Sequence, residues 1–199
     1  MQTIKAITGL LFKLLLWAAA VFAGYLLQMC VMPYVNIAGV TPSLLFAFMG
    51  VMTVCYGRLR SFWTGGIYGI LMETMMPSIT MLNLVFYPIA GALAAVPFAD
   101  KNEKQQETDR SMNRDARNGN VYVRSVLGAG LISLLNEIIN ITYIYLGGTT
   151  LEALHFRRGL IAIVSTMVLT LLIAWPLRHL LGFKHAPREE KTTRGRYIL

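Results

Sequence analysis

Two carboxylates stand apart from the other ionisable residues of this sequence. Glu73 and Glu137 lie inside long apolar stretches, whereas the remaining acidic residues lie in short gaps or in the C-terminal tail. An ionisable residue among apolar side chains is typical of a proton or ligand site. It is also compatible with a protonated carboxyl group that hydrogen-bonds a neighbouring helix and fixes its packing. The sequence leaves both interpretations open.

Small and polar residues recur at helical spacing around these carboxylates. Four apolar stretches carry such a face: Ala20, Gly24 and Gln28; then Gly65, Gly66, Gly69 and Glu73; then Asn83, Tyr87, Gly91 and Ala95; and finally Gly130, Ser133, Glu137 and Asn140, with Asn136 beside them. Small residues let a second helix approach closely. We therefore expect Glu73 to face protein, and the interior of a bundle to be lined by small and polar residues.

The sequence lacks the common motifs of catalysis and metal binding. No stretch has the Gly-x-x-x-x-Gly-Lys pattern that cradles phosphates, and no serine has a Gly-x-Ser-x-Gly setting. His155, His179 and His185 lie at or beyond the ends of the last apolar stretch, without a second ligand at metal-binding spacing. Cys30 and Cys55 are most simply read as small apolar core residues. We expect no enzyme activity, no cofactor and no metal.

The composition predicts an all-α membrane protein. Hydrophobic residues make up 55% of the chain and charged residues only 14%. This is too little polar surface for a water-facing globule. A helix needs about 20 apolar residues to cross a bilayer. We predict one integral membrane domain over residues 1–199, a polytopic helical bundle of about six transmembrane helices. The candidate spans are 10–33, 42–57, 61–77, 79–99, 121–146 and 156–182. Only Gly57, Arg58, Leu59 and Arg60 separate the second span from the third, so this pair is either a tight helical hairpin or one helix that dips into the membrane.

The basic residues predict the orientation, because cytoplasmic loops hold an excess of Lys and Arg. With six spans and both termini in the cytoplasm, all of the 18 basic residues except Arg157 and Arg158 lie inside. The net charge of +8 then reflects this rule and anionic lipid, and is no sign of nucleic-acid binding. Residues 100–120 are expected to form a flexible cytoplasmic linker, and residues 184–199 a basic cytoplasmic tail.

Residues 39–95 resemble the MreD family of rod shape-determining membrane proteins. The resemblance rests on Gly39 and Pro42 at the start of the second span, on Gly65, Gly69, Ile70, Leu71 and Glu73 in the third, and on Tyr87 and Gly91 in the fourth. The family commonly has Asp where this chain has Glu73. The resemblance implies a non-catalytic component of the rod complex, or elongasome, in the bacterial inner membrane. It would maintain cell shape by coupling peptidoglycan synthesis to the MreB cytoskeleton. The implied partners are MreC, MreB, RodZ, RodA and a class B penicillin-binding protein.

An alternative is the substrate-binding S-component of an energy-coupling-factor vitamin transporter. Those proteins are similar in size, helix number and basic character, and the MreD family is thought to share their general fold. Ala19 and Ala23, or Ala20 and Gly24, could mimic the Ala-x-x-x-Ala surface through which S-components dock, although such spacing is common in packed membrane helices. A vitamin site would draw polar and aromatic groups from the outer halves of the last three spans, where Asn83 and Tyr87 fit loosely.

Overall fold

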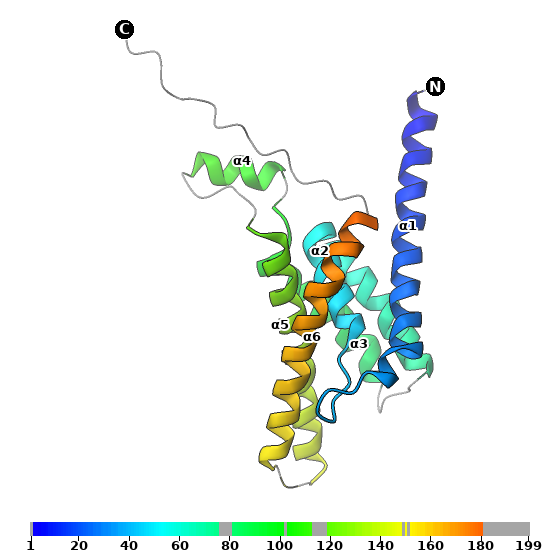
Figure 1. The fold of residues 1–199 in the computed structure, drawn as a ribbon. Helices are drawn as coiled ribbons and strands as arrows, with labels where there is room; N and C mark the ends of the chain where they lie inside the picture. The colour runs from blue at the N-terminus through cyan, green and yellow to red at the C-terminus, as the bar shows by residue number, and fades with distance from the viewer. Residues whose placement is uncertain are drawn as a thin grey trace.

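The computed structural model describes residues 2–75, 81–101, 103–112, 119–148, 150 and 152–180. Its elements are helices, so the predicted all-α bundle is confirmed (Figure 1). In chain order they are α1 (Gln2–Cys30), the short 3₁₀ helix η1 (Met32–Tyr34), α2 (Leu44–Met75), α3 (Leu82–Phe98), α4 (Glu103–Ser111), α5 (Val121–Leu146) and α6 (Ala153–Leu180). The basic tail at residues 184–199 and the end of the last predicted span lie outside the described residues.

Helix α2 is a hairpin of two helical segments that meet at Gly57. Gly57 has φ 78° and ψ −174°. This backbone conformation is essentially restricted to glycine. One hydrogen bond joins the two segments, and we call it the hairpin clamp: Thr53 Oγ1 of the first segment and Ser61 Oγ of the second lie 2.6 Å apart. Both side chains are buried. Of the two arrangements expected for the second and third spans, the structure therefore has the tight hairpin.

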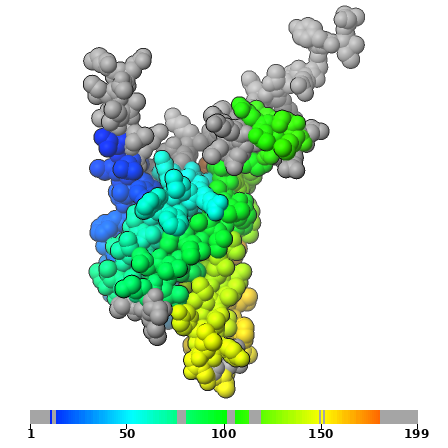
Figure 2. All heavy atoms as spheres, turned by 180° about the vertical axis from the view of Figure 1, so that it is seen from behind, coloured from blue at the N-terminus to red at the C-terminus, as the bar shows by residue number. Residues whose placement is uncertain are grey.

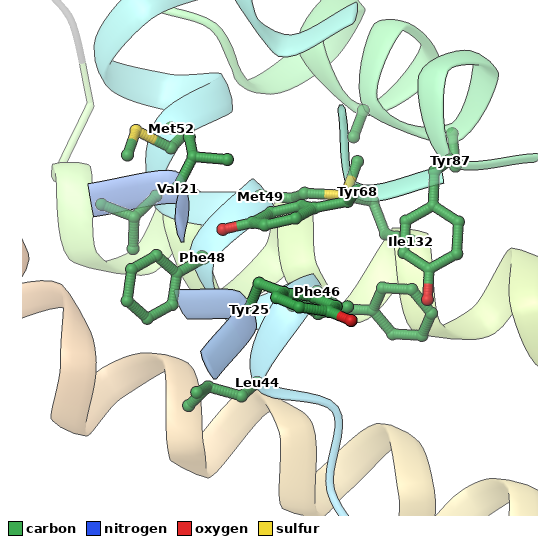
Figure 3. Packing of buried hydrophobic residues seen from close by; sticks show 14 of the residues in the cluster. Val21, Tyr25, Leu44, Phe46, Phe48, Met49, Met52, Tyr68, Tyr87 and Ile132 are labelled. Carbon is green, nitrogen blue, oxygen red and sulfur yellow. The ribbon is translucent and has the colours of Figure 1, made fainter. Parts of the chain in front are cut away.

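The first segment of α2 is the central helix of the bundle. Every residue from Leu44 to Val54 is buried, which is typical of a helix that is apolar on all sides. Figure 3 shows side chains from α1, both segments of α2, α3 and α5 meeting around it, among them Tyr25, Met49, Tyr68 and Ile132. We expected small and polar residues to line the interior. The centre is instead filled by large apolar side chains of the second predicted span.

The beginning of α2 is held by its two flanking helices. The backbone N–H of Leu44 donates to Gln28 Oε1 of α1 at 2.6 Å, and that of Ser43 donates to Thr166 Oγ1 of α6 at 3.2 Å. The first N–H groups of a helix have no partner within it, so side chains must satisfy them when the helix begins inside a protein. Pro42, predicted to open this span, is buried directly before these groups.

Among the residues that the structure describes, three helices are long and apolar enough to cross a membrane: Leu14–Tyr34, Val121–Leu146 and Ala153–His179. They indicate a membrane protein. Helix α3 is apolar but shorter. The first segment of α2 is also short, with a length of about 20 Å at about 1.5 Å per residue. The count of six complete spans therefore remains a prediction. The predicted span 121–146 coincides with α5.

Polar and aromatic residues mark two levels along the long helices. At a rise of about 1.5 Å per residue, about 28 Å separates Arg124 from Tyr143 on α5, and about 30 Å separates Arg158 from Arg178 on α6. Both spacings match the roughly 30 Å thickness of a bilayer's hydrocarbon core. Figure 1 shows the start of α1, α4 and the end of α6 at the same end of the bundle, which we call the basic end after its residues Arg58, Arg124 and Arg178. At the other end the tip of α5 and α6 projects past α2 and α3 (Figure 2).

The segment between α3 and α5 is not wholly the flexible linker that we predicted. Its residues 103–111 form the helix α4, and Lys101 Nζ lies 2.8 Å from Asp109 Oδ2 in an ion pair that ties this helix back to the end of α3. Gln106 also donates from Nε2 to the carbonyl of Lys101, at 3.1 Å. The scarcity of apolar residues argues against a buried span here, but it does not exclude an exposed helix stabilised by polar contacts.

Candidate functional site

The glycine-rich face of α2 is the surface on which α3 packs. A Cβ atom at Gly65 would collide with the carbonyl oxygen of Tyr87, and would lie 2.7 Å from its carbonyl carbon and 2.8 Å from Pro88 Cα. One turn later, a Cβ at Gly69 would lie 2.7 Å from the carbonyl oxygen of Asn83. Cβ contacts this short do not occur in proteins, so glycine at both positions is what lets the two backbones touch. The structure thus brings together four of the predicted site residues: Gly65, Gly69, Asn83 and Tyr87.

Gly91 extends this contact between α2 and α3, which we call the glycine seam, as far as the hairpin clamp. Its carbonyl accepts the hydroxyl of Ser61 at 2.9 Å, while a Cβ at Gly91 would meet Met49 Cε at 2.9 Å. Gly66 does not belong to the seam, because a Cβ there would have no neighbour within 4 Å. Grouping it with Gly65 and Gly69 was wrong, since adjacent residues point about 100° apart around a helix. The seam is therefore formed by Gly65 and Gly69 on α2 and by Asn83, Tyr87 and Gly91 on α3.

A second close contact, between α2 and α5, was not predicted. A Cβ at Gly50 would lie 2.6 Å from the carbonyl oxygen of Ser125 and 2.7 Å from Ala129 Cβ. Gly50, Ser125, Gly128 and Ala129 are all buried. The signal was present in the sequence, because Ser125 and Ala129 stand four residues apart and Gly128 lies between them at helical spacing. Gly50 itself is a single glycine in an apolar run and gives no comparable pattern.

Glu73 and Glu137 occupy different helices and different surroundings. Glu73 is half-buried in the last turn of α2. Glu137 is half-buried on α5, where Gly159 of α6 leaves room for it: a Cβ at Gly159 would lie 3.3 Å from Glu137 Oε2. Asn136 is half-buried beside it, whereas Asn140, expected on the interior face, is exposed. The face of α5 that includes Glu137 therefore packs against α6. The residues of α5 that are buried in the bundle centre are Ser125, Ala129 and Ile132 instead.

At the basic end, one arginine joins the end of α3 to the beginning of α5. Arg124 donates from Nη2 to the carbonyl of Phe98 at 2.6 Å and also to that of Ala99, and its Nη1 pairs with the carboxylate of Asp100. The planar guanidinium carries five N–H donors in a fixed fork, so it can satisfy several acceptors at once. The carbonyls at the end of α3 have no partner within the helix, so Arg124 supplies one. The backbone N–H of Asp100 in turn donates to the carbonyl of Val54 at 3.1 Å, next to the hairpin.

A cavity of about 730 Å³ opens beside this arginine. It lies between the hairpin at Gly57, the last turn of α3, α4 and the beginning of α5. Its lining residues are Tyr56, Gly57, Arg58, Leu59, Ala95, Val96, Pro97, Ala99, Asp100, Lys101, Asp109, Gly119 and Arg124. Sequence reasoning did not find this site, because its residues come from four segments that only the fold brings together.

The cysteines and the other metal-binding residue types form no centre of their own. Cys30, expected in the core, is exposed, whereas Cys55 is half-buried. Within the part of the chain that the structure describes, no three His, Cys, Asp or Glu side chains gather where they could hold a metal ion.

The chain was also compared with protein families, with curated proteins and with solved structures, and none of these comparisons found a match.

Proposed function

We propose that this chain is a non-catalytic membrane component of the bacterial rod complex, which maintains cell shape by coupling peptidoglycan synthesis to the MreB cytoskeleton. One observation carries the proposal. Of the residues that resemble the MreD family, Gly65, Gly69, Tyr87 and Gly91 lie where α2 and α3 pack, and the backbone of α3 touches α2 at Gly65 and Gly69. Gly39, which also belongs to the resemblance, lies in a turn where a Cβ would have no neighbour within 4 Å, so the weight rests on the glycines between α2 and α3.

The outer surface supports a role in assembly with other membrane proteins. Large apolar side chains on α1 and α6 point away from the bundle, including Leu15 at 70% exposure and Leu172 at 67%. In a bilayer such faces contact lipid or the helices of other proteins. A scaffold that joins a cytoskeletal protein to wall-building enzymes needs faces of this kind and no reaction centre of its own.

The position of the cavity bears on the alternative, a vitamin-binding S-component. An S-component would be expected to bind its ligand in the outer halves of the last three spans. The cavity described above lies at the other end, next to Arg58, Lys101 and Arg124, which the basic-residue rule assigns to the cytoplasm. This arrangement favours the scaffold over the transporter subunit.

The proposal is tested by purifying the tagged full-length chain from its own membranes in mild detergent and identifying the co-purifying proteins by mass spectrometry. Recovery of MreC, RodA or a class B penicillin-binding protein supports the rod complex. Recovery of a paired ABC ATPase with its transmembrane coupling protein overturns it in favour of the transporter.

Site-specific photocrosslinking in intact cells then identifies the partner-binding face. A photoreactive phenylalanine analogue at Leu15 or Leu172 should crosslink to a protein that the first experiment recovers. The same analogue at Leu160, which is 65% exposed but lies towards the opposite end of α6, tests whether crosslinking is local. Crosslinks of equal yield at all three positions would indicate random collisions in the membrane and count against a defined interface.

A further inference from the structure

We propose that the cavity at the basic end binds the phosphodiester headgroup of an anionic glycerophospholipid, with Arg58 as the residue that recognises the phosphate. This site is independent of the proposed function and does not involve the residues of the glycine seam. The cavity has a volume of about 730 Å³. This volume is within the usual range for small-ligand sites.

The level of the cavity in the bundle is that of lipid headgroups. Arg124, which lines the cavity, stands about 28 Å from Tyr143 along α5, so the two residues lie near opposite faces of a hydrocarbon core about 30 Å thick. Tyrosines typically occupy such an interface. A cavity beside Arg124 therefore opens where the phosphates of one leaflet lie.

The lining combines two exposed apolar residues, which we call its apolar edge, with charged residues. Leu59 and Val96 are 72% and 66% exposed, and both line the cavity. The charged residues on the lining are Arg58, Lys101 and Arg124 together with Asp100 and Asp109. An acyl chain next to the apolar edge would thus place its headgroup beside these charges, as in basic pockets between helices that bind anionic lipids.

The internal ion pairs leave Arg58 as the cation for a ligand. Arg124 pairs with Asp100, and Lys101 pairs with Asp109. Among the described residues no carboxylate pairs with Arg58, whose side chain is exposed. The lining therefore retains one positive charge in excess, and a guanidinium can bind two phosphate oxygens at once. Arg60 provides a contrast two residues later: its guanidinium stacks on the ring of Tyr56 at 4.8 Å, and it does not line the cavity.

Native mass spectrometry of the purified full-length chain, titrated with phosphatidylglycerol, tests the site. Arg58→Gln should weaken binding of the first lipid about fivefold, the effect typical of one basic residue near a membrane surface. Arg58→Lys, which keeps the charge but not the planar fork that binds two phosphate oxygens, should lose less affinity than Arg58→Gln. Arg60→Gln, the matched control, should bind like the wild type. An equal loss for Arg58→Gln and Arg60→Gln would mean diffuse attraction to the surface and would overturn the site. So would unchanged binding by Arg58→Gln.

Two further arms identify the ligand class. Phosphatidylethanolamine, which has a phosphate but no net charge, should bind more weakly than phosphatidylglycerol; equal binding would overturn the selectivity for anionic lipid. Soluble glycerophosphoglycerol should compete poorly, because it lacks the acyl chains that contact Leu59 and Val96. Competition as strong as that of the intact lipid would assign the cavity to a soluble phosphodiester and overturn the lipid proposal. Neither result bears on the co-purification that tests the rod complex.

Discussion

Replacing Gly65 with alanine should destabilise the bundle, whereas the same change at Gly66 should not. The added Cβ at Gly65 would collide with the Tyr87 carbonyl oxygen, and its next neighbours, at 2.7 and 2.8 Å, are also backbone atoms of α3. An ordinary contact is about 3.5 Å, so α3 must retreat by about 1 Å. No side-chain rotation can relieve this clash. Overpacking of this kind typically costs about 1 to 3 kcal/mol.

Gly66 is the matched control because it is the adjacent residue of the same helix and a Cβ there meets nothing within 4 Å. Alanine at an open helical position gains up to about 1 kcal/mol over glycine. For a chain of this size, about 1 kcal/mol shifts the melting temperature by about 2 to 4 °C. Gly65→Ala should therefore lower the melting temperature by about 2 to 12 °C, and Gly66→Ala should leave it unchanged or raise it by up to about 4 °C.

Thermal unfolding in one detergent, followed by circular dichroism and by loss of the monodisperse size-exclusion peak, measures both variants. The reasoning fails if Gly65→Ala melts at or above the wild-type temperature, since α3 could not then pack on Gly65 as described. It fails equally if Gly66→Ala is as unstable as Gly65→Ala, because the loss would then reflect glycine content rather than backbone contact.

Three further variants test other parts of the structure. Gly57 has φ 78°, and a Cβ there would have no neighbour within 4 Å. Gly57→Ala should therefore lower stability by about 1 to 3 kcal/mol through backbone strain alone, as measured by thermal melting. Ala38 has φ 53° and is followed by Gly39 in a turn. Asn followed by Gly is preferred in such turns, so Ala38→Asn should raise stability by about 0.5 to 1 kcal/mol in the same assay. Glu73→Gln should complement a deletion strain at normal membrane levels, because the amide keeps the shape and hydrogen-bonding capacity of a protonated carboxyl group.

Each of these variants has a result that contradicts its premise. A Gly57→Ala protein as stable as the wild type would show that the hairpin does not need the glycine-only conformation. A destabilised Ala38→Asn protein would mean that the turn has a different geometry. Complete loss of complementation by Glu73→Gln, with normal membrane levels, would show that the ionised carboxylate is required and would replace the packing interpretation with a chemical one.

Local sequence signals predicted the ends of α5 and the glycine face of α2. Helix α5 matches its predicted range because Asn120 caps its beginning, accepting the N–H of Tyr122 at 3.0 Å, and Gly147 follows its last residue. The seam follows from four-residue spacing, which puts Gly65 and Gly69 on one face whatever their partner is. Spacing also explains the error at Gly66, which is adjacent to Gly65 in the sequence but not on the same face.

The burial of the first α2 segment could not be predicted in this way. A membrane helix surrounded by lipid and one surrounded by protein are both apolar on every side, so the run from Leu44 to Val54 has no periodicity that separates the two. The cavity could not be predicted from the sequence either. Arg58 and Arg124 are far apart in the sequence. Arg124 is paired with Asp100 at the end of α3, and Lys101 is paired with Asp109 on α4, and only the fold forms these two ion pairs.

The capping of α2 has a consequence for biosynthesis. The N–H of Ser43 is satisfied by Thr166, 123 residues later in the chain. A ribosome therefore completes α2 well before it makes the last helix, and until α6 arrives the beginning of α2 lacks one of its two external hydrogen-bond acceptors. Nascent chains arrested before Thr166 should consequently be degraded faster than the complete protein. The central helix of this bundle therefore has both of these hydrogen bonds only after α6 has been made.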